Sequence, residues 1–131
     1  MEQRIQTPAT VLVVEDEILL RMCATEAMQD DGLSTFEADA GSDALTILDS
    51  HPEIQVVFTD INIHGAMNGL QLAQEVARKH PNVQVVITSG RRRPAISEMP
   101  HGALFVPKPY PLEQLTGLVG QLCKRSTASP H

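Results

Sequence analysis

Short, almost continuous hydrophobic runs alternate along this chain with longer segments of helical periodicity. The runs Thr10–Val14, Val56–Asp60 and Gln84–Ser89 are rich in β-branched residues and short, so they predict buried strands. Weaker strands are expected at Ser34–Glu37 and Ala103–Val106. Strands that are apolar on both faces are typical of a parallel sheet covered by helices on both sides.

Four segments have apolar residues spaced three and four positions apart, which predicts helices at about 17–29, 43–50, 68–80 and 111–124. The inward face of the first helix is expected to consist of Leu20, Cys23, Ala24, Ala27 and Met28. Ser42 is a candidate cap for the second helix, because a serine side chain can accept a hydrogen bond from the first turn.

The segment Arg91–Leu104 is short for a crossover helix and contains Pro94 and Pro100, so a short or irregular fourth helix is expected there. Strand and helix otherwise alternate. Right-handed crossovers then predict a doubly wound α/β fold with one five-stranded parallel sheet in the flavodoxin-like order 2-1-3-4-5 and helices on both faces. In such folds a ligand binds at the carboxyl ends of the strands.

Charged and hydroxyl side chains gather at those carboxyl ends. Glu15 and Asp16 follow the first strand, Asp60 ends the third, Ser89 ends the fourth and Lys108 follows the fifth. Three clustered carboxylates repel one another unless a cation lies among them. All-oxygen ligands favour Mg²⁺ or Ca²⁺, and room for waters and a phosphate oxygen suits Mg²⁺. The pattern predicts a magnesium pocket in which Asp60 accepts a phosphoryl group.

Each of these residues also has an ordinary interpretation when it is taken alone. Asp16 could cap a helix, Ser89 could belong to a turn, and Lys108 could be a solvated loop charge. Only their joint order along the strands favours a shared site. The run Arg91–Arg92–Arg93 remains open between a docking patch for an acidic partner, a source of charge near the phosphate, and a solvated loop, whereas His64 is expected to be exposed.

Composition narrows the class of protein. A chain of 131 residues with 42% hydrophobic and 20% charged residues fits one globular domain, expected at 10–125 between a flexible lead-in at 1–9 and a flexible tail at 126–131. The net charge of −6 argues against direct binding of nucleic acid. Cys23 and Cys123 are expected to be buried free thiols. No apolar run reaches the ~18 residues of a membrane span, so a cytoplasmic protein without membrane contact is expected.

Four segments in order resemble the receiver domain of a two-component response regulator: residues 11–17 (VLVVEDE), 58–62 (FTDIN), 88–90 (TSG) and 108–110 (KPY). The resemblance covers about residues 10–124. It implies that a sensor histidine kinase or a histidine phosphotransfer protein donates a phosphoryl group to Asp60. The domain would not be an enzyme beyond self-phosphorylation and autodephosphorylation. It would signal to a downstream protein as a monomer or weak dimer. With only a short tail after the last helix, a stand-alone receiver is expected.

The resemblance also implies roles for single residues. Asp16, Asp60 and the backbone carbonyl of Asn62 would bind Mg²⁺, while Glu15, where the family more often has Asp, would act through water. Lys108 would contact the phosphoryl group and precede a cis peptide bond.

Two further residues would form the switch that reports phosphorylation. Ser89 would be the switch hydroxyl, with the neighbouring Thr88 as the alternative, because alternation along a strand brings only one of the two into the site. Phe105 occupies the aromatic switch position and, lacking a hydroxyl, can report the state only by packing.

Three alternative functions fit the sequence less well. A phosphohydrolase of the haloacid-dehalogenase type would need a second carboxylate two residues after the acceptor, where this chain has Asn62. A flavodoxin-like FMN module would need a phosphate-binding loop after the first strand, where acids stand instead. A receiver-like domain that is never phosphorylated is disfavoured by the intact set of site residues.

Overall fold

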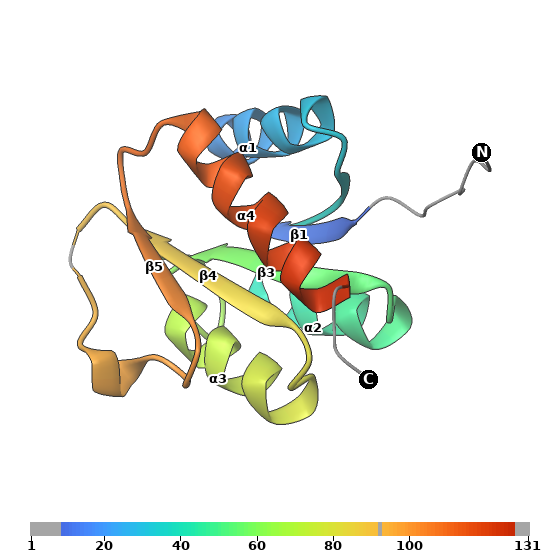
Figure 1. Cartoon of the computed structure of the whole chain (residues 1–131). Helices are drawn as coiled ribbons and strands as arrows, with labels where there is room; N and C mark the ends of the chain where they lie inside the picture. The colour runs from blue at the N-terminus through green and yellow to red at the C-terminus, as the bar shows by residue number, and fades with distance from the viewer. Residues whose placement is uncertain (1–8, 92, 128–131) are drawn as a thin grey trace, which may run out of the picture.

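Five parallel strands form the centre of the protein and lie in the order β2-β1-β3-β4-β5 (Figure 1). The structure is a computed structural model and describes residues 9–91 and 93–127. The strands are β1 (Thr10–Val14), β2 (Ser34–Ala38), β3 (Ile54–Asp60), β4 (Gln84–Ser89) and β5 (Leu104–Pro107). This order and the parallel pairing confirm the predicted fold class.

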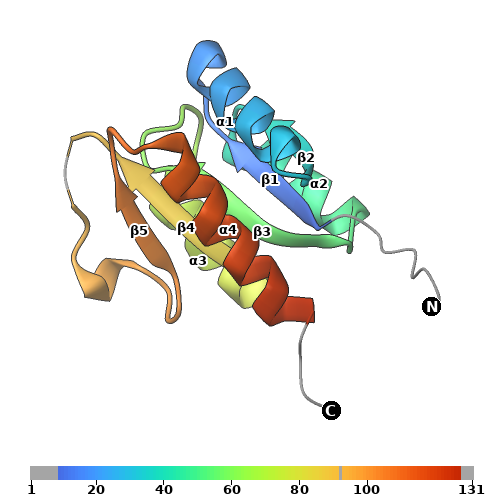
Figure 2. The same ribbon diagram turned by 45° about the horizontal axis from the view of Figure 1, so that its top comes forward.

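Helices cover both faces of the sheet (Figures 1 and 2). They are α1 (Ile18–Asp30), α2 (Gly41–Ser50), α3 (Gly69–Lys79) and α4 (Leu112–Thr127). Helices α1 and α4 pack on one face, over a core that includes Val13, Met28, Phe58, Val106 and Leu115. Helices α2 and α3 pack on the other face, over a core that includes Leu12, Leu48, Val57, Leu72 and Ile87. Each strand therefore alternates its side chains between two apolar layers.

The connection from β4 to β5 has little regular structure. Its described residues contain one short 3₁₀ turn, η1 (Ile96–Glu98), between Pro94 and Pro100. This confirms the expected short or irregular fourth helix. Arg92 lies outside the described residues, so the three-arginine run can be followed only at Arg91 and Arg93.

Helix α3 starts with a complete capping box. The Asn68 side chain accepts a hydrogen bond from the Gln71 amide at 2.9 Å, and the Gln71 side chain accepts one from the Asn68 amide at 2.8 Å. The Gly69 amide donates to the carbonyl of Ile61 at 2.7 Å. The start of α3 is thereby tied directly to the chain that leaves β3 after Asp60.

The predicted inward face of α1 was partly wrong. Cys23 is exposed, and the buried residues of the helix are Ala24, Thr25 and Met28. Periodicity placed Cys23 inside because the first turns of α1 are apolar on several sides. Cys123 on α4 is buried as predicted, and burial raises the pKa of its thiol.

The predicted cap of α2 was also wrong. The helix begins at Gly41, after Ala40 as its N-cap, and no side chain caps it. Gly41 lies so close to the side chain of Met67 that a Cβ at this position would overlap it. The helix therefore begins one residue before Ser42, at a position where the packing of Met67 favours a residue without a Cβ.

The last helix ends later than the sequence predicted. Helix α4 continues to Thr127, three residues past its predicted end. Residues 1–8 of the expected lead-in and 128–131 of the expected tail lie outside the described residues. No helix within residues 9–91 and 93–127 combines the length and apolar character needed to cross a membrane.

Candidate functional site

Three of the predicted site residues meet at the carboxyl edge of the sheet. The Lys108 Nζ donates to Asp60 Oδ2 at 2.6 Å and to Glu15 Oε2 at 3.1 Å. The carboxylate side chains of Glu15 and Asp60 are each only 7% exposed, and that of Lys108 is 20% exposed. The ends of β1, β3 and β5 therefore bring two nearly buried carboxylates onto one ammonium group.

Strand register explains this convergence. Val13 pairs with Phe58 across β1 and β3, and both belong to the core under α1 and α4. Because side chains alternate along a strand, Glu15 and Asp60, two residues further on, face the same side. Val106 belongs to the same core, which places Lys108 on this side of β5. A slip of one residue in any of these strands would separate the charges.

Backbone contacts fix the two carboxylates. Asp60 Oδ1 accepts a hydrogen bond from the Asn62 amide at 3.0 Å, and Glu15 Oε1 accepts one from the Glu17 amide at 3.1 Å. One carboxylate oxygen of each acid thus accepts from a main-chain amide, and the other accepts from Lys108. The peptide bond between Lys108 and Pro109 is cis, as the sequence predicted.

The charges in this cluster influence one another. Burial raises the pKa of Glu15, and the nearby charge of Asp60 adds to that rise, although hydrogen bonds from the Glu17 amide and Lys108 oppose it. Burial disfavours the charged form of Lys108, but its hydrogen bonds and attraction to Asp60 and Glu15 outweigh this and raise its pKa. Lys108 is therefore held as a cation beside Asp60 at neutral pH.

Asp16 lies next to this cluster in the chain, and its side chain takes a different partner. Its Oδ2 is 3.1 Å from His64 Nδ1, and the two side chains are 21% and 62% exposed. Protonation of His64 would make this contact an ion pair. His64 is exposed as expected, and its contact with Asp16 was not foreseen.

The oxygen donors at this edge suit Mg²⁺ better than a metal that needs a full protein cage. Within residues 9–91 and 93–127, no three Asp, Glu, His or Cys side chains converge as a metal site. Mg²⁺ commonly uses one or two carboxylates and keeps several waters. Glu15, Asp60 and the neighbouring Asp16, with the carbonyl of Asn62, would supply oxygen donors of that kind.

Both candidate switch hydroxyls lie at the end of β4 and are buried. Thr88 pairs with Asp60 in the sheet register, and its Oγ1 has no hydrogen-bond partner within the described part of the chain. The Oγ of Ser89 accepts a hydrogen bond from the Arg91 amide at 3.2 Å, while its carbonyl accepts one from the Lys108 amide at 3.1 Å. Thr88 lies two residues after Val86 of the core under α1 and α4, so it faces the same side as Asp60, whereas Ser89 lies two residues after Ile87 of the opposite core. Alternation along β4 therefore favours Thr88, the alternative, over Ser89 as the switch hydroxyl.

Phe105 is half-buried on β5 and pairs with Ile87 of β4, so it faces the core under α2 and α3. The guanidinium of Arg93 lies 5.3 Å from the centre of its ring. Such cation–π contacts contribute about 0.5–1 kcal/mol at exposed sites. One arginine of the basic run therefore covers the aromatic position that the sequence assigned to the switch.

Two residues that support the site were not identified from the sequence. Arg21 donates to the main-chain carbonyl of Glu15, and Gly69 packs directly against the main chain of Asp60. Neither leaves a motif in the sequence, because each acts through a backbone atom of another segment.

The fold is a doubly wound parallel sheet whose carboxyl edge holds two buried acids and a lysine. The profile of the response regulator receiver domain family matches residues 11–119. The chain belongs to this family, and it is a receiver domain of two-component signal transduction. Receiver domains act as phosphoacceptors rather than as enzymes in the usual sense, take phosphoryl groups from histidine kinases and generally bind Mg²⁺ at the phosphorylation site.

Individual relatives agree with this assignment. The chain is 34% identical over 121 residues to the sensor kinase CckA of Brucella abortus, covering 89% of this chain and 13% of that protein. It is 38% identical over 86 residues to the aerobic respiration control protein ArcA of Escherichia coli K12, covering 66% of this chain and 34% of that protein. The chain thus spans about a third or less of these curated relatives.

A solved structure gives the same result. The response regulator receiver protein of Sinorhizobium medicae superposes with a TM-score of 0.81 at 27% identity, covering 91% of this chain and 97% of the other. None of these matches supports the haloacid-dehalogenase alternative.

Proposed function

We propose that this receiver domain accepts a phosphoryl group on Asp60, in a Mg²⁺-dependent reaction, from a sensor histidine kinase or a histidine phosphotransfer protein in the cytoplasm. The observation that carries the proposal is the 2.6 Å contact between Lys108 Nζ and Asp60 Oδ2 at a carboxylate that is only 7% exposed. A cation this close to a buried aspartate can neutralise charge on an incoming phosphoryl group. The signal then passes to a downstream protein through surface contacts.

The proposed reaction transfers a phosphoryl group from a histidine of the donor protein to Asp60. Asp60 Oδ2 attacks phosphorus, the P–N bond to the donor imidazole breaks, and the nitrogen keeps the bonding electron pair. Lys108 offsets negative charge on the phosphoryl oxygens, and a bound Mg²⁺ would supply further positive charge there. Asp16, Asp60 and the carbonyl of Asn62 would hold the ion, with Glu15 acting through water. Attack of water on the same phosphorus returns Asp60 to its carboxylate and accounts for autodephosphorylation.

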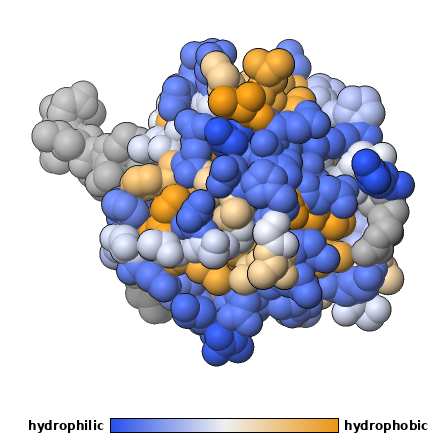
Figure 3. Space-filling view, turned by 180° about the vertical axis from the view of Figure 1, so that it is seen from behind, coloured by the Kyte–Doolittle hydropathy of each residue, from blue (hydrophilic) through white to orange (hydrophobic). Residues whose placement is uncertain are grey.

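The surface beside Asp60 offers a place for the donor to bind. Ile18, Leu19 and Met22 on α1 are 59%, 72% and 45% exposed, and Leu112 on α4 is 40% exposed. Figure 3 shows hydrophobic colour at the top of the molecule, where α1 lies, among hydrophilic residues. A cavity of about 490 Å³ between these helices is lined by Cys23, Lys108 and Tyr110, among others. A partner seated on this face would therefore lie next to Lys108.

Phosphoryl uptake from a small donor tests the proposal. Wild-type protein incubated with acetyl phosphate and Mg²⁺ should gain one phosphate by intact mass, and removal of Mg²⁺ with EDTA should prevent the gain. Mg²⁺ should be required because Lys108 alone offsets only part of the negative charge at a site with three acids. A phosphate adduct of equal extent with and without EDTA would contradict the role of Mg²⁺, and absence of any adduct would contradict the proposed function.

Thr88 is proposed as the switch hydroxyl, because alternation along β4 places it on the side of Asp60, and Phe105 as the aromatic residue that repacks after phosphorylation. Thr88→Val should leave phosphoryl uptake within about tenfold of wild type, since a neutral hydrogen bond contributes about 0.5–1.5 kcal/mol. It should also suppress the phosphorylation-dependent shift of a fluorinated Phe105 followed by ¹⁹F NMR.

Ser89→Ala is the matched control, because it removes the other hydroxyl at the end of β4. This variant should keep the Phe105 shift. Loss of the shift in Ser89→Ala and its retention in Thr88→Val would assign the switch to Ser89, as the sequence predicted.

A further inference from the structure

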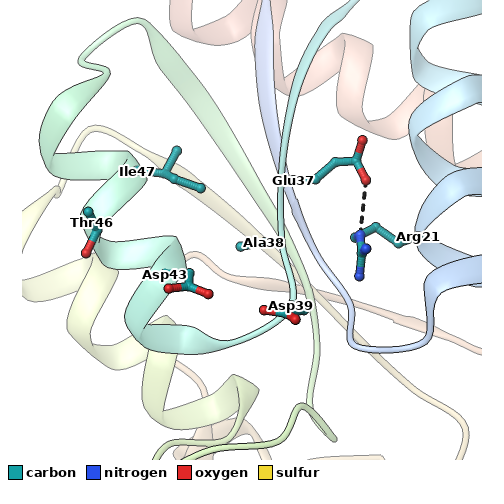
Figure 4. A pocket seen from close by; sticks show the side chains of 7 residues that line it. All are labelled: Arg21, Glu37, Ala38, Asp39, Asp43, Thr46 and Ile47. Atoms are coloured by element: carbon teal, nitrogen blue, oxygen red, sulfur yellow. Dashed lines mark hydrogen bonds and ion pairs between the residues drawn. The ribbon is translucent and has the colours of Figure 1, made fainter.

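Arg21 on α1 connects the phosphoacceptor site to the neighbouring strand β2. Its Nη1 donates to the main-chain carbonyl of Glu15 at 2.8 Å, and its Nε donates to Glu37 Oε1 at 3.0 Å. Its side chain is 17% exposed. Figure 4 shows the guanidinium and the Glu37 carboxylate pointing toward one another, with Asp39 and Asp43 lining the same cavity of about 370 Å³.

The contact from Arg21 is one of four hydrogen bonds that hold Glu15 in place. Its amide donates to the carbonyl of Ala38 at 3.1 Å, and its carboxylate oxygens accept from the Glu17 amide and from Lys108. Its carbonyl accepts from Arg21. All four polar atoms of Glu15 therefore have partners, and the carbonyl is the one held by a side chain from a helix.

The hydrogen bond from Arg21 to the Glu15 carbonyl also affects Asp16. The carbonyl of Glu15 and the amide of Asp16 belong to one planar peptide group. Holding that carbonyl fixes the orientation of the whole peptide, which carries the Glu15 side chain at one end and the Asp16 side chain at the other. An arginine suits this task because its planar fork donates in two fixed directions at once.

We propose that Arg21 is a positioning residue for phosphoryl transfer, and that the ion pair with Glu37 orients its guanidinium. Arg21 holds the Glu15–Asp16 peptide and thereby fixes the directions in which the two acidic side chains leave the main chain beside Asp60. This inference rests on the proposed function and adds to it a residue outside the set of metal ligands and reacting groups. Glu37, on the edge strand, thereby contributes to the site without touching it.

Binding of Mg²⁺ alone provides a test that does not depend on activity. The unphosphorylated protein is titrated with Mg²⁺, and the amide shifts of residues 15–17 and 60–62 are followed by ¹H–¹⁵N NMR. Arg21→Ala should weaken Mg²⁺ affinity about tenfold, the lower end of the loss seen when partners of metal ligands are removed. Arg21→Lys should fall between Arg21→Ala and wild type, because a lysine can donate to the carbonyl and lacks the second fixed direction.

Arg78→Ala is the matched control. Arg78 forms an exposed ion pair with Glu75 on α3 at 2.7 Å, and the described contacts of this pair lie away from the site. Its removal should leave Mg²⁺ affinity unchanged. Thermal melts of each variant ensure that the titration is made on folded protein. Should Arg21→Ala not fold, Glu37→Ala takes its place, with an expected loss of about threefold that Glu37→Gln, which keeps an acceptor oxygen, should largely restore.

The outcomes separate this inference from the proposed function. Folded Arg21→Ala that binds Mg²⁺ within twofold of wild type would overturn the positioning role, as would Glu37→Ala with wild-type affinity where that variant carries the test. An equal loss in Arg78→Ala would overturn it too. If wild-type protein neither binds Mg²⁺ nor takes up phosphate from acetyl phosphate, the proposed function itself fails.

Discussion

Replacing Asp60 by asparagine should abolish phosphoryl uptake while leaving the fold intact. An amide lacks the nucleophilic carboxylate oxygen that must attack phosphorus. The substitution keeps an oxygen that can accept the hydrogen bond from the Asn62 amide, now made at 3.0 Å to Asp60 Oδ1. It also leaves Lys108 paired with Glu15. Incubation with acetyl phosphate and Mg²⁺, followed by intact mass, should therefore show no adduct, and far-ultraviolet circular dichroism should match wild type.

Asp39→Asn is the control for the Asp60 experiment. Asp39 directly follows β2, at the same edge of the sheet, but it is exposed and lines the cavity beside Arg21. Its replacement should leave phosphoryl uptake unchanged. An adduct of wild-type extent on Asp60→Asn would remove Asp60 from the acceptor role and direct the search to Glu15 and Asp16.

The centre of the site was predictable because it depends on strand ends. A buried parallel strand is recognisable from a β-branched run, and the residue that follows it must emerge at the carboxyl edge. Glu15, Asp60 and Lys108 all follow from that rule, and the structure places both acids within hydrogen-bond distance of Lys108. The irregular link between β4 and β5 followed from its prolines for a similarly local reason.

What could not be predicted depends on contacts between distant segments. The exposure of Cys23, Leu19 and Met22 could not be derived from periodicity, because a helix that is apolar on several sides has no unique inward face. At the start of α2, Gly41 packs against the side chain of Met67, more than 20 residues later, and no local pattern in the sequence indicates this contact. The pairing of Asp16 with His64 likewise requires two loops to meet in space.

Arg21 illustrates the same limit within the site. An arginine on the surface of a predicted helix normally indicates solvation, and only coordinates reveal that it donates to the carbonyl of Glu15. Gly69 is a second example, because a glycine between two predicted elements normally indicates only a turn. The structure instead makes it a point where two backbone segments touch.

Gly69→Ala should therefore destabilise the protein strongly. A Cβ at Gly69 would overlap the carbonyl oxygen of Asp60 and lie 2.7 Å from both the carbonyl carbon of Asp60 and the Cα of Ile61. These are backbone atoms, so no change of rotamer can relieve the overlap. Inserting atoms into a packed site costs typically 1–3 kcal/mol and occasionally more, so a fall of about 3 kcal/mol in the free energy of unfolding is expected. Urea denaturation measures this change.

Gly117→Ala on α4 is the matched control, because Gly117 is exposed within a helix and nothing lies within 4 Å of its added Cβ. Alanine is the better helix former, so this variant should gain about 0.5–1 kcal/mol. The two substitutions add the same methyl group and differ only in what surrounds it. If Gly69→Ala proved as stable as Gly117→Ala, the close approach of α3 to the backbone of Asp60 would not be a feature of the folded protein.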